Sequence, residues 1–325
     1  MRTLKKLHVI SVVVVSFVVG PGFGIRLASA QNPTPQEYQK QLEEYEKKKA
    51  AIEAENKSKL AANEDQRKEN EKKRAYNEGN TLLKRGQYAD ALAAYDQAIK
   101  VDSTYASAYY GKGLALKGLR RYQEAIKAYK GAIRHEPSNE NYYFGLGKIY
   151  SDLEQHDSAI DIFKKAIEQE PKNYKAYYEL GAAYQAKNMY KEAAEAQRQA
   201  TQLNPEYYQA FYTLGVSLNK LGNFTEALEA LDKSIAIKSG WHLPHYLKAE
   251  ILNKTTKHQD ALAEAQEALK SKAGYAPAAY EAGRALKAMG RYNEATNFFV
   301  EAGKDRVWKK LADYEIEDIK RLQGR

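Results

Sequence analysis

An alanine recurs every 34 residues through most of this 325-residue chain, seven times and without an insertion or deletion. The series consists of Ala91, Ala125, Ala159, Ala193, Ala227, Ala261 and Ala295. A second series with the same period is glycine in all but one place: Gly79, Gly113, Gly147, Gly181, Gly215, Ala249 and Gly283. Self-similarity at one fixed period predicts a solenoid in which each unit is a single supersecondary structure.

Two aromatic series share this period. The first is Tyr76, Tyr110, Phe144, Tyr178, Tyr212, Tyr246 and Tyr280, and the second is Tyr88, Tyr122, His156, Tyr190, Phe224, His258 and Tyr292. Abundant Ala, Glu, Lys and Leu with only eight Pro favour helix over strand. We expect the glycine and alanine series to lie in two successive helices whose axes approach closely. One such unit cannot bury its apolar face alone, so neighbouring units must stack.

The fourth unit contains Tyr177, Leu180, Gly181 and Tyr184, followed by Ala193, Ala200 and Pro205. This order resembles the tetratricopeptide repeat pattern W-x2-L-G-x2-Y…A-x3-F…A…P, with Tyr in place of Trp. The resemblance implies an all-α, right-handed α-α superhelix. Gln197 stands where the pattern has an aromatic residue, His245 stands where a large apolar residue is usual, and Ser239 and Ala273 replace the closing Pro. These departures predict less regular packing in the fifth to seventh units.

The repeat register predicts four regions. They are a signal peptide at 1–30, a charged helical spacer or weak coiled coil at 31–71, seven repeat units at 72–309, and a C-terminal capping helix at 310–325. The seven units are 72–105, 106–139, 140–173, 174–207, 208–241, 242–275 and 276–309. In the capping helix, we expect one apolar face made of Trp308, Leu311, Ile316, Ile319 and Leu322.

The first thirty residues have the order of a secretory signal. Basic residues precede an apolar run at 7–20, and Ala28-Ser29-Ala30 supplies small residues at a cleavage site. The run is about 14 residues long, shorter than the roughly 20 that span a bilayer as a helix. We therefore predict cleavage after Ala30 and no membrane span in the mature chain, with an uncleaved anchor as the alternative.

Acidic and basic residues alternate through residues 31–71, which favours a solvated helix. Apolar side chains at Tyr38, Leu42, Tyr45 and Ile52 fit a heptad seam that Lys49 and Asn56 interrupt. The sequence leaves two interpretations open: a helical spacer, or a coiled coil through which the chain forms a homo-oligomer.

The resemblance also implies a concave groove lined by the first helix of each unit. The groove residues that it implies are Tyr110, Phe144, Tyr178, Tyr212, Tyr246, Tyr280, Lys148, Asn219 and Asn253. Aromatic contacts contribute about 0.5–1.5 kcal/mol each, so several could hold an extended peptide. The two asparagines could pair with its backbone. The alternative is that the tyrosines support packing between units.

Nothing in the sequence predicts catalysis, a metal or another cofactor. The absence of Cys excludes disulfides and thiolate chemistry, and the His242–His245 pair lacks a third ligand. The net charge is +9, but most basic residues alternate with acidic ones and form no dense basic cluster. This distribution argues against a nucleic-acid partner. We predict an exported scaffold, in the periplasm or cell envelope of a bacterium, that binds a protein or peptide. The alternative is a polysaccharide-binding or export-assisting module.

Overall fold

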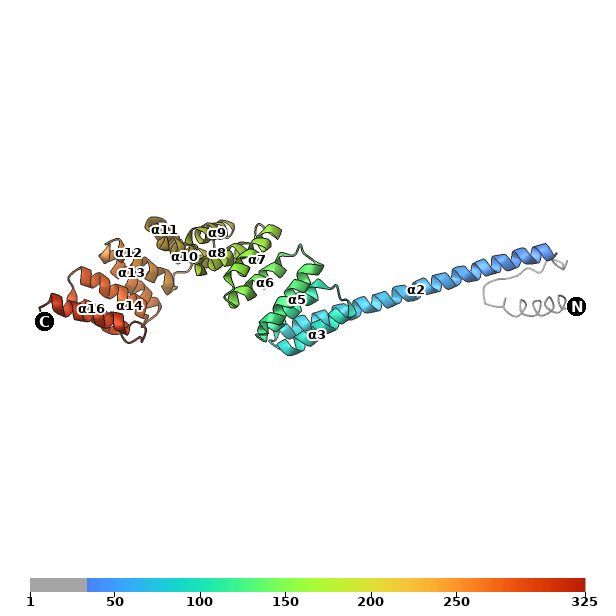
Figure 1. Ribbon diagram of the computed structural model, residues 1–325, viewed down its shortest axis with the longest axis horizontal. Helices are drawn as coiled ribbons and strands as arrows, with labels where there is room; N and C mark the ends of the chain where they lie inside the picture. Colours follow the sequence, from blue (N-terminus) through green and yellow to red (C-terminus); the bar gives the residue numbers. More distant parts are fainter. Residues whose placement is uncertain (1–33, 325) are drawn as a thin grey trace. The chain divides into compact units, whose positions relative to one another are not determined.

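The computed structural model describes residues 34–324 (Figure 1). The predicted signal peptide at 1–30 lies outside the described residues. Residues 34–324 form α-helices joined by short turns, with no strand among them, which confirms the all-α prediction. None of the helices in this range is long and apolar enough to cross a membrane.

The helices follow one another in a regular order. They are α2 (Pro35–Lys84), α3 (Tyr88–Val101), α4 (Ala106–Gly118), α5 (Tyr122–His135), α6 (Glu140–Asp152), α7 (His156–Gln169), α8 (Tyr174–Ala186), α9 (Tyr190–Leu203), α10 (Tyr208–Lys220), α11 (Phe224–Ile237), α12 (His242–Lys254), α13 (His258–Ser271), α14 (Ala276–Ala288), α15 (Tyr292–Ala302) and α16 (Lys309–Leu322).

The chain divides into two compact parts, residues 1–67 and 68–325, and α2 contributes to both. Within the first part, the described side chains of α2 are exposed almost throughout. Leu42, Tyr45 and Ile52, three members of the predicted heptad seam, are among these exposed side chains. The seam is therefore an uncovered apolar stripe in the single chain.

In the second part, pairs of antiparallel helices repeat every 34 residues. The second aromatic series marks where α3, α5, α7, α9, α11, α13 and α15 begin. Each of these helices carries an acid in its first turn, such as Glu124 in α5 and Glu192 in α9, where the helix dipole favours negative charge. Helices α10 to α14 keep the lengths of α4 to α9, whereas α15 in the seventh unit has 11 residues where the other second helices have 14.

The turn between the two helices of each unit requires a left-handed backbone at one fixed position. Gly86, Gly222 and Gly290 occupy it in three units, and Arg120, Glu154, Asn188 and Thr256 occupy it in the others. Glycine adopts this conformation without a steric penalty, whereas a β-branched residue is the least suited to it.

Replacing Thr256 by Gly is therefore expected to stabilise the protein. Thr256 has φ 61°, and a left-handed residue with a Cβ costs about 1–2 kcal/mol relative to the right-handed form. We expect Thr256→Gly to raise the free energy of unfolding by about 1 kcal/mol in urea melts. The reverse change at the matched position, Gly222→Thr, should lower it. A destabilising Thr256→Gly would contradict this interpretation of the turn.

The glycine series makes room for large side chains of the second helix. A Cβ added to Gly147 would lie 2.6 Å from Cε1 of Phe163, and one added to Gly113 would lie 2.8 Å from Cε1 of Tyr129. Both rings are fully buried. In these units, the ring 16 residues after the glycine thus fills the space that the missing Cβ leaves between the two helices.

The close approach of the two helices is also present where no ring intervenes. In the fourth unit, a Cβ on Gly181 would lie 3.2 Å from the carbonyl oxygen of Ala193. Gln197 replaces the ring there and is fully buried. Its Oε1 accepts a 2.8 Å hydrogen bond from the Ser217 hydroxyl, which links this unit to the next. The substituted position thus exchanges an aromatic contact for a buried polar one.

The last helix, α16, packs through fewer apolar residues than predicted. Ala312 and Ile319 are buried, and Ile316 packs against the same core cluster. Leu311 and Leu322 are exposed, so their assignment to the buried face was wrong. Residues 312, 316 and 319 share one helical face, and Leu311 and Leu322 lie about 100° away around the helix axis.

Candidate functional site

The first aromatic series forms a ladder, one member on each first helix. The aromatic ladder consists of Tyr76, Tyr110, Phe144, Tyr178, Tyr212, Tyr246 and Tyr280 on α2, α4, α6, α8, α10, α12 and α14. Every member is partly buried. The structure therefore places each predicted aromatic site residue at an equivalent point of its unit, with part of the ring accessible.

Most ladder rings rest against a second aromatic residue that sequence reasoning missed. Tyr178 meets Tyr207 with ring centroids 5.1 Å apart, and Tyr212 meets Trp241 at 4.7 Å, both edge to face. Tyr76 meets Tyr105 and Tyr246 meets Tyr275 in the same way, and Tyr280 meets Trp308 with the rings tilted. The packing role left open from sequence is thus real, and it fixes the orientation of the rings.

The aromatic residues that contact the ladder rings could have been found from their spacing in the sequence. Tyr105, Tyr207, Trp241 and Tyr275 occupy the last position of their units and follow the 34-residue period. Each is the residue just before a first helix, at the N-cap of α4, α10, α12 and α14. The series was hidden because Asn139 and Asn173 occupy this position in two units and bond the helix N-terminus instead.

The ladder hydroxyls are neutral hydrogen-bonding groups. Burial raises the pKa of Tyr212 and of Tyr280 to about 12, and it also raises the pKa of Tyr178 and of Tyr246. The ordinary value is 10.0, so none of these phenols ionises near neutral pH. The ladder therefore offers uncharged ring faces to a ligand, and the hydroxyls of Tyr246 and Tyr280 already donate to Glu250 and Glu315.

The predicted polar site residues are bound to neighbouring units. The Nζ atom of Lys148 donates to Oε1 of Glu179 on the next first helix at 2.7 Å. Asn253 is buried and donates through Nδ2 to the backbone oxygen of Glu281 at 2.9 Å and to its Oε2 at 2.8 Å. The expectation that Asn253 pairs with a peptide backbone is thus not supported by its contacts.

Asn219 on α10 is likewise bound to residues of the next first helix, α12. It is buried, its Nδ2 lies 3.4 Å from Oε1 of Glu250, and its Oδ1 accepts from Lys254 at 3.3 Å. Burial alone would raise the pKa of Glu250. The hydrogen bond and the positive charge of Lys254 lower this pKa, and so do the hydrogen bonds from Asn219 and Tyr246. Glu250 therefore remains a carboxylate beside the Tyr246 hydroxyl, 3.3 Å away.

These contacts belong to a recurring link between units. A polar side chain near the end of one first helix reaches the next first helix. Gln185 donates to the Thr213 carbonyl oxygen at 2.9 Å, Lys117 pairs with Asp152 at 3.1 Å, and Lys287 pairs with Asp318 at 2.6 Å. Because the links join the same helices that carry the ladder, they fix the spacing between its rings.

Glu281 is the most buried acid in this network. Burial raises its pKa above the ordinary 4.5, although Asn253 and Arg284 oppose the shift. A raised folded-state pKa means stability that is present at low pH and lost as the carboxyl ionises. We expect Glu281→Gln to stabilise the protein at neutral pH by about 1 kcal/mol.

The pH dependence checks this assignment. The advantage of Glu281→Gln should vanish below pH 4.5, where the wild-type carboxyl is also protonated. Urea unfolding at acidic and neutral pH measures it, and Glu267→Gln, an exposed acid, is the control. A loss of stability at neutral pH would instead show that the Arg284 ion pair dominates.

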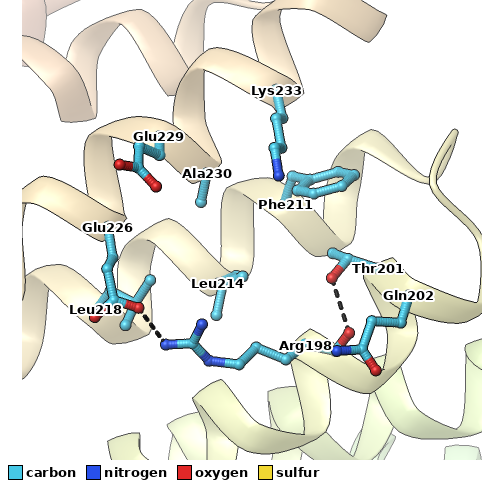
Figure 2. Close-up of a pocket in the computed structure, with 10 residues that line it drawn as sticks. All are labelled: Arg198, Thr201, Gln202, Phe211, Leu214, Leu218, Glu226, Glu229, Ala230 and Lys233. Carbon is cyan, nitrogen blue, oxygen red and sulfur yellow. Dashed lines mark hydrogen bonds and ion pairs between the residues drawn. The ribbon is translucent and has the colours of Figure 1, made fainter.

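A separate hollow of about 220 Å³ lies between α9, α10 and α11 (Figure 2). Phe211, Leu214 and Leu218 form its apolar wall and are buried. Arg198 on α9 pairs with Glu226 on α11 across it at 2.5 Å. None of the predicted site residues lines this hollow.

His242 and His245, which are close in the sequence, contact different neighbours. His245 Nδ1 lies 2.7 Å from Oε2 of Glu264, and the His242 ring lies against Tyr275 with centroids 4.6 Å apart. Among residues 34–324, no three His, Asp or Glu side chains are grouped so that they could hold a metal ion.

Comparison with known proteins places the repeats in a family. Residues 76–141 and 114–174 match the family model of the tetratricopeptide repeat, and residues 152–234 match that of the anaphase-promoting complex, cyclosome, subunit 3. A search of curated proteins finds no match. The crystal structure of YrrB, described as a TPR protein with an unusual peptide-binding site, shares 31% identity over 52% of this chain and 88% of that chain, with a TM-score of 0.47.

Two further structures cover more of the chain. That of Pseudomonas aeruginosa pilF shares 18% identity over 68% of this chain and 98% of that chain, with a TM-score of 0.55. The C-terminal part of a TPR repeat-containing protein from Cytophaga hutchinsonii shares 16% identity over 74% of this chain and 99% of that chain, with a TM-score of 0.62. At these identities the two structures show the common fold alone.

Proposed function

Because this chain belongs to the tetratricopeptide repeat family, we propose that it is an exported scaffold of the bacterial cell envelope that binds partner proteins along the aromatic ladder. The observation that carries the proposal is the ladder itself: equivalent rings on successive first helices, each partly accessible and most held by a second ring. Such a surface is already ordered before binding, so little side-chain entropy is lost when a ligand docks.

The chemistry of the ladder suits an extended protein segment. Ring faces accept apolar side chains or prolines, and the neutral hydroxyls of Tyr178 and Tyr212 can donate to backbone carbonyl groups. Each aromatic contact contributes about 0.5–1.5 kcal/mol, so three or four adjacent rings would give modest affinity. The asparagines are left out of this proposal, because their donors hold neighbouring units together.

A triple replacement tests the ladder. We expect Tyr178→Ala, Tyr212→Ala and Tyr246→Ala together to abolish capture of protein partners from envelope extract. The matched control replaces Tyr122, Tyr190 and Tyr292, tyrosines that begin second helices, in the same way. Melting curves must show that both triple variants fold. Unchanged partners for the ladder variant would refute the proposal, and retained binding to cell-wall polysaccharide fragments alone would favour the alternative module.

Export is supported by the sequence at residues 1–30. The basic start, apolar run and Ala28-Ser29-Ala30 predict a mature chain that begins at Gln31. Intact-mass measurement of the protein from the producing cell tests this. A chain that retains Met1 would contradict cleavage.

The exposed stripe of α2 supports self-association as a further part of the proposal. Leu42, Tyr45 and Ile52 follow a heptad spacing, and Lys48 and Glu53 flank it with opposite charges. We expect light scattering to show a concentration-dependent dimer that Leu42→Glu with Ile52→Glu abolishes. A monomer at all concentrations would leave residues 34–67 as a spacer.

A further inference from the structure

Helix α16 continues the register of the repeats. Ala312, Tyr314 and Ile319 follow Ala278, Tyr280 and Ala285 by 34 residues each. Lys287 pairs with Glu315 and Asp318 on α16, much as Asn253 bonds Glu281 one unit earlier. The helix therefore docks on the seventh unit as the first helix of another unit would, and Tyr314 occupies the next position of the aromatic ladder.

An exposed apolar stripe runs along α16 beside its buried face. Leu311, Tyr314 and Leu322 are 50%, 62% and 57% exposed, and their spacing places them on one side of the helix. Within the described chain, Tyr314 makes no ring contact, whereas Tyr280 packs against Phe299 and Trp308. Three large apolar side chains exposed on one short helix are characteristic of a docking surface rather than of scattered exposure.

Two cations border the stripe. Lys310 and Arg321 lie on the same edge of the helix as Tyr314. The hydrogen bond from Lys287 lowers the pKa of Asp318, and the charge of Arg321 adds to this shift. Lys309 pairs with Asp313 at 3.2 Å and Lys320 with Glu317 at 2.6 Å. Lys310 and Arg321 therefore place positive charge at the edge of the apolar stripe.

We propose that Leu311, Tyr314 and Leu322, with Lys310 and Arg321, bind an acidic segment of a partner protein that also carries an aromatic or leucine side chain. The apolar side chain would cover Tyr314, and carboxylates would pair with the two cations. A second copy of α16 fits this surface poorly, because it brings the same positive edge. The inference rests on the proposed protein-binding role and adds the chemistry of the ligand.

A peptide-display selection on the full chain tests the proposal. We expect enriched peptides to combine Asp or Glu with Trp, Tyr, Phe or Leu. Their binding, measured by fluorescence anisotropy, should weaken roughly tenfold in Leu311→Ser with Tyr314→Ser. In Lys310→Glu with Arg321→Glu, binding should weaken by at least as much, and added salt should no longer weaken it further, because salt then screens a repulsion. The control is Leu221→Ser, an exposed leucine at the end of α10, which should change nothing.

Several outcomes would overturn the inference. They are failure to enrich any peptide, enrichment of basic peptides, and binding that persists in both double variants. Loss of self-association in Leu311→Ser with Tyr314→Ser would identify a second copy as the occupant instead. The test is separable from that of the ladder, because replacing Tyr178, Tyr212 and Tyr246 leaves α16 intact.

Discussion

Replacing Phe299 by alanine is expected to lower the free energy of unfolding by about 3–5 kcal/mol. The Phe299 ring is fully buried, and a Cβ on Gly283 would lie 2.7 Å from its Cε1 atom. The ring therefore fills the space that the glycine leaves between two helices, and its removal creates a cavity that the backbone cannot close. Urea unfolding followed by circular dichroism measures the loss.

The adjacent phenylalanine provides a matched control. Phe298 lies on the same helix, α15, and is only partly buried, so Phe298→Ala removes the same atoms from a less enclosed site. We expect its cost to be less than half of that for Phe299→Ala. Equal losses for the two variants would show that the ring opposite the glycine has no special role in joining the helices.

Replacing Gly147 by alanine is expected to cost about 1–3 kcal/mol, although alanine is the better helix former. The new methyl group would lie 2.6 Å from Cε1 of the buried Phe163 ring, so the ring or a helix must move. Gly240 is the control, because a Cβ there meets none of the described atoms within 4 Å. We expect Gly240→Ala to change stability by less than about 0.5 kcal/mol.

The sixth unit predicts how this loss can be reduced. It carries Ala249 and Ala265 at the two positions that hold Gly147 and Phe163 in the third unit, and both alanines are fully buried. Gly147→Ala combined with Phe163→Ala should therefore cost less than the sum of the two single changes. Additive costs would contradict a direct contact between the positions.

The 34-residue period was sufficient to predict the helical architecture. The second aromatic series marks the start of each second helix, and the first series lies on the first helices. The period could not show which residues touch across a unit. Tyr95, Tyr129, Phe163 and Phe299 share one unit position, but only their contacts with glycine reveal its purpose.

The polar members of the predicted site were harder to assign. Asn219 and Asn253 stand at positions that face solvent when one helix is considered alone, and the structure covers both with the next helix. Their partners, Glu250 and Glu281, lie 31 and 28 residues away, a separation at which helical periodicity within one element gives no information. The contact between units decides whether such a residue is free.

The C-terminal helix shows the same difficulty in an apolar case. Five hydrophobic residues from Trp308 to Leu322 fit a single face loosely, and sequence alone gave no reason to divide them. The docking of α16 on α14 and α15 buries Ala312 and Ile319 and leaves Leu311 and Leu322 exposed. A small residue, Ala312, thus marks the contact face better than the larger leucines do.

The central claim is that partner proteins bind along the aromatic ladder, and site-specific photo-crosslinking in the native cell envelope tests it most directly. A photoreactive phenylalanine analogue would replace Tyr178, Tyr212 or Tyr246 in turn, with Tyr122 and Tyr190 on second helices as controls. Mass spectrometry would then identify the attached peptides. We predict that one set of partner segments attaches at the ladder positions and not at the controls. Attachment to the same segments at the controls alone, or at all five positions equally, would contradict the claim.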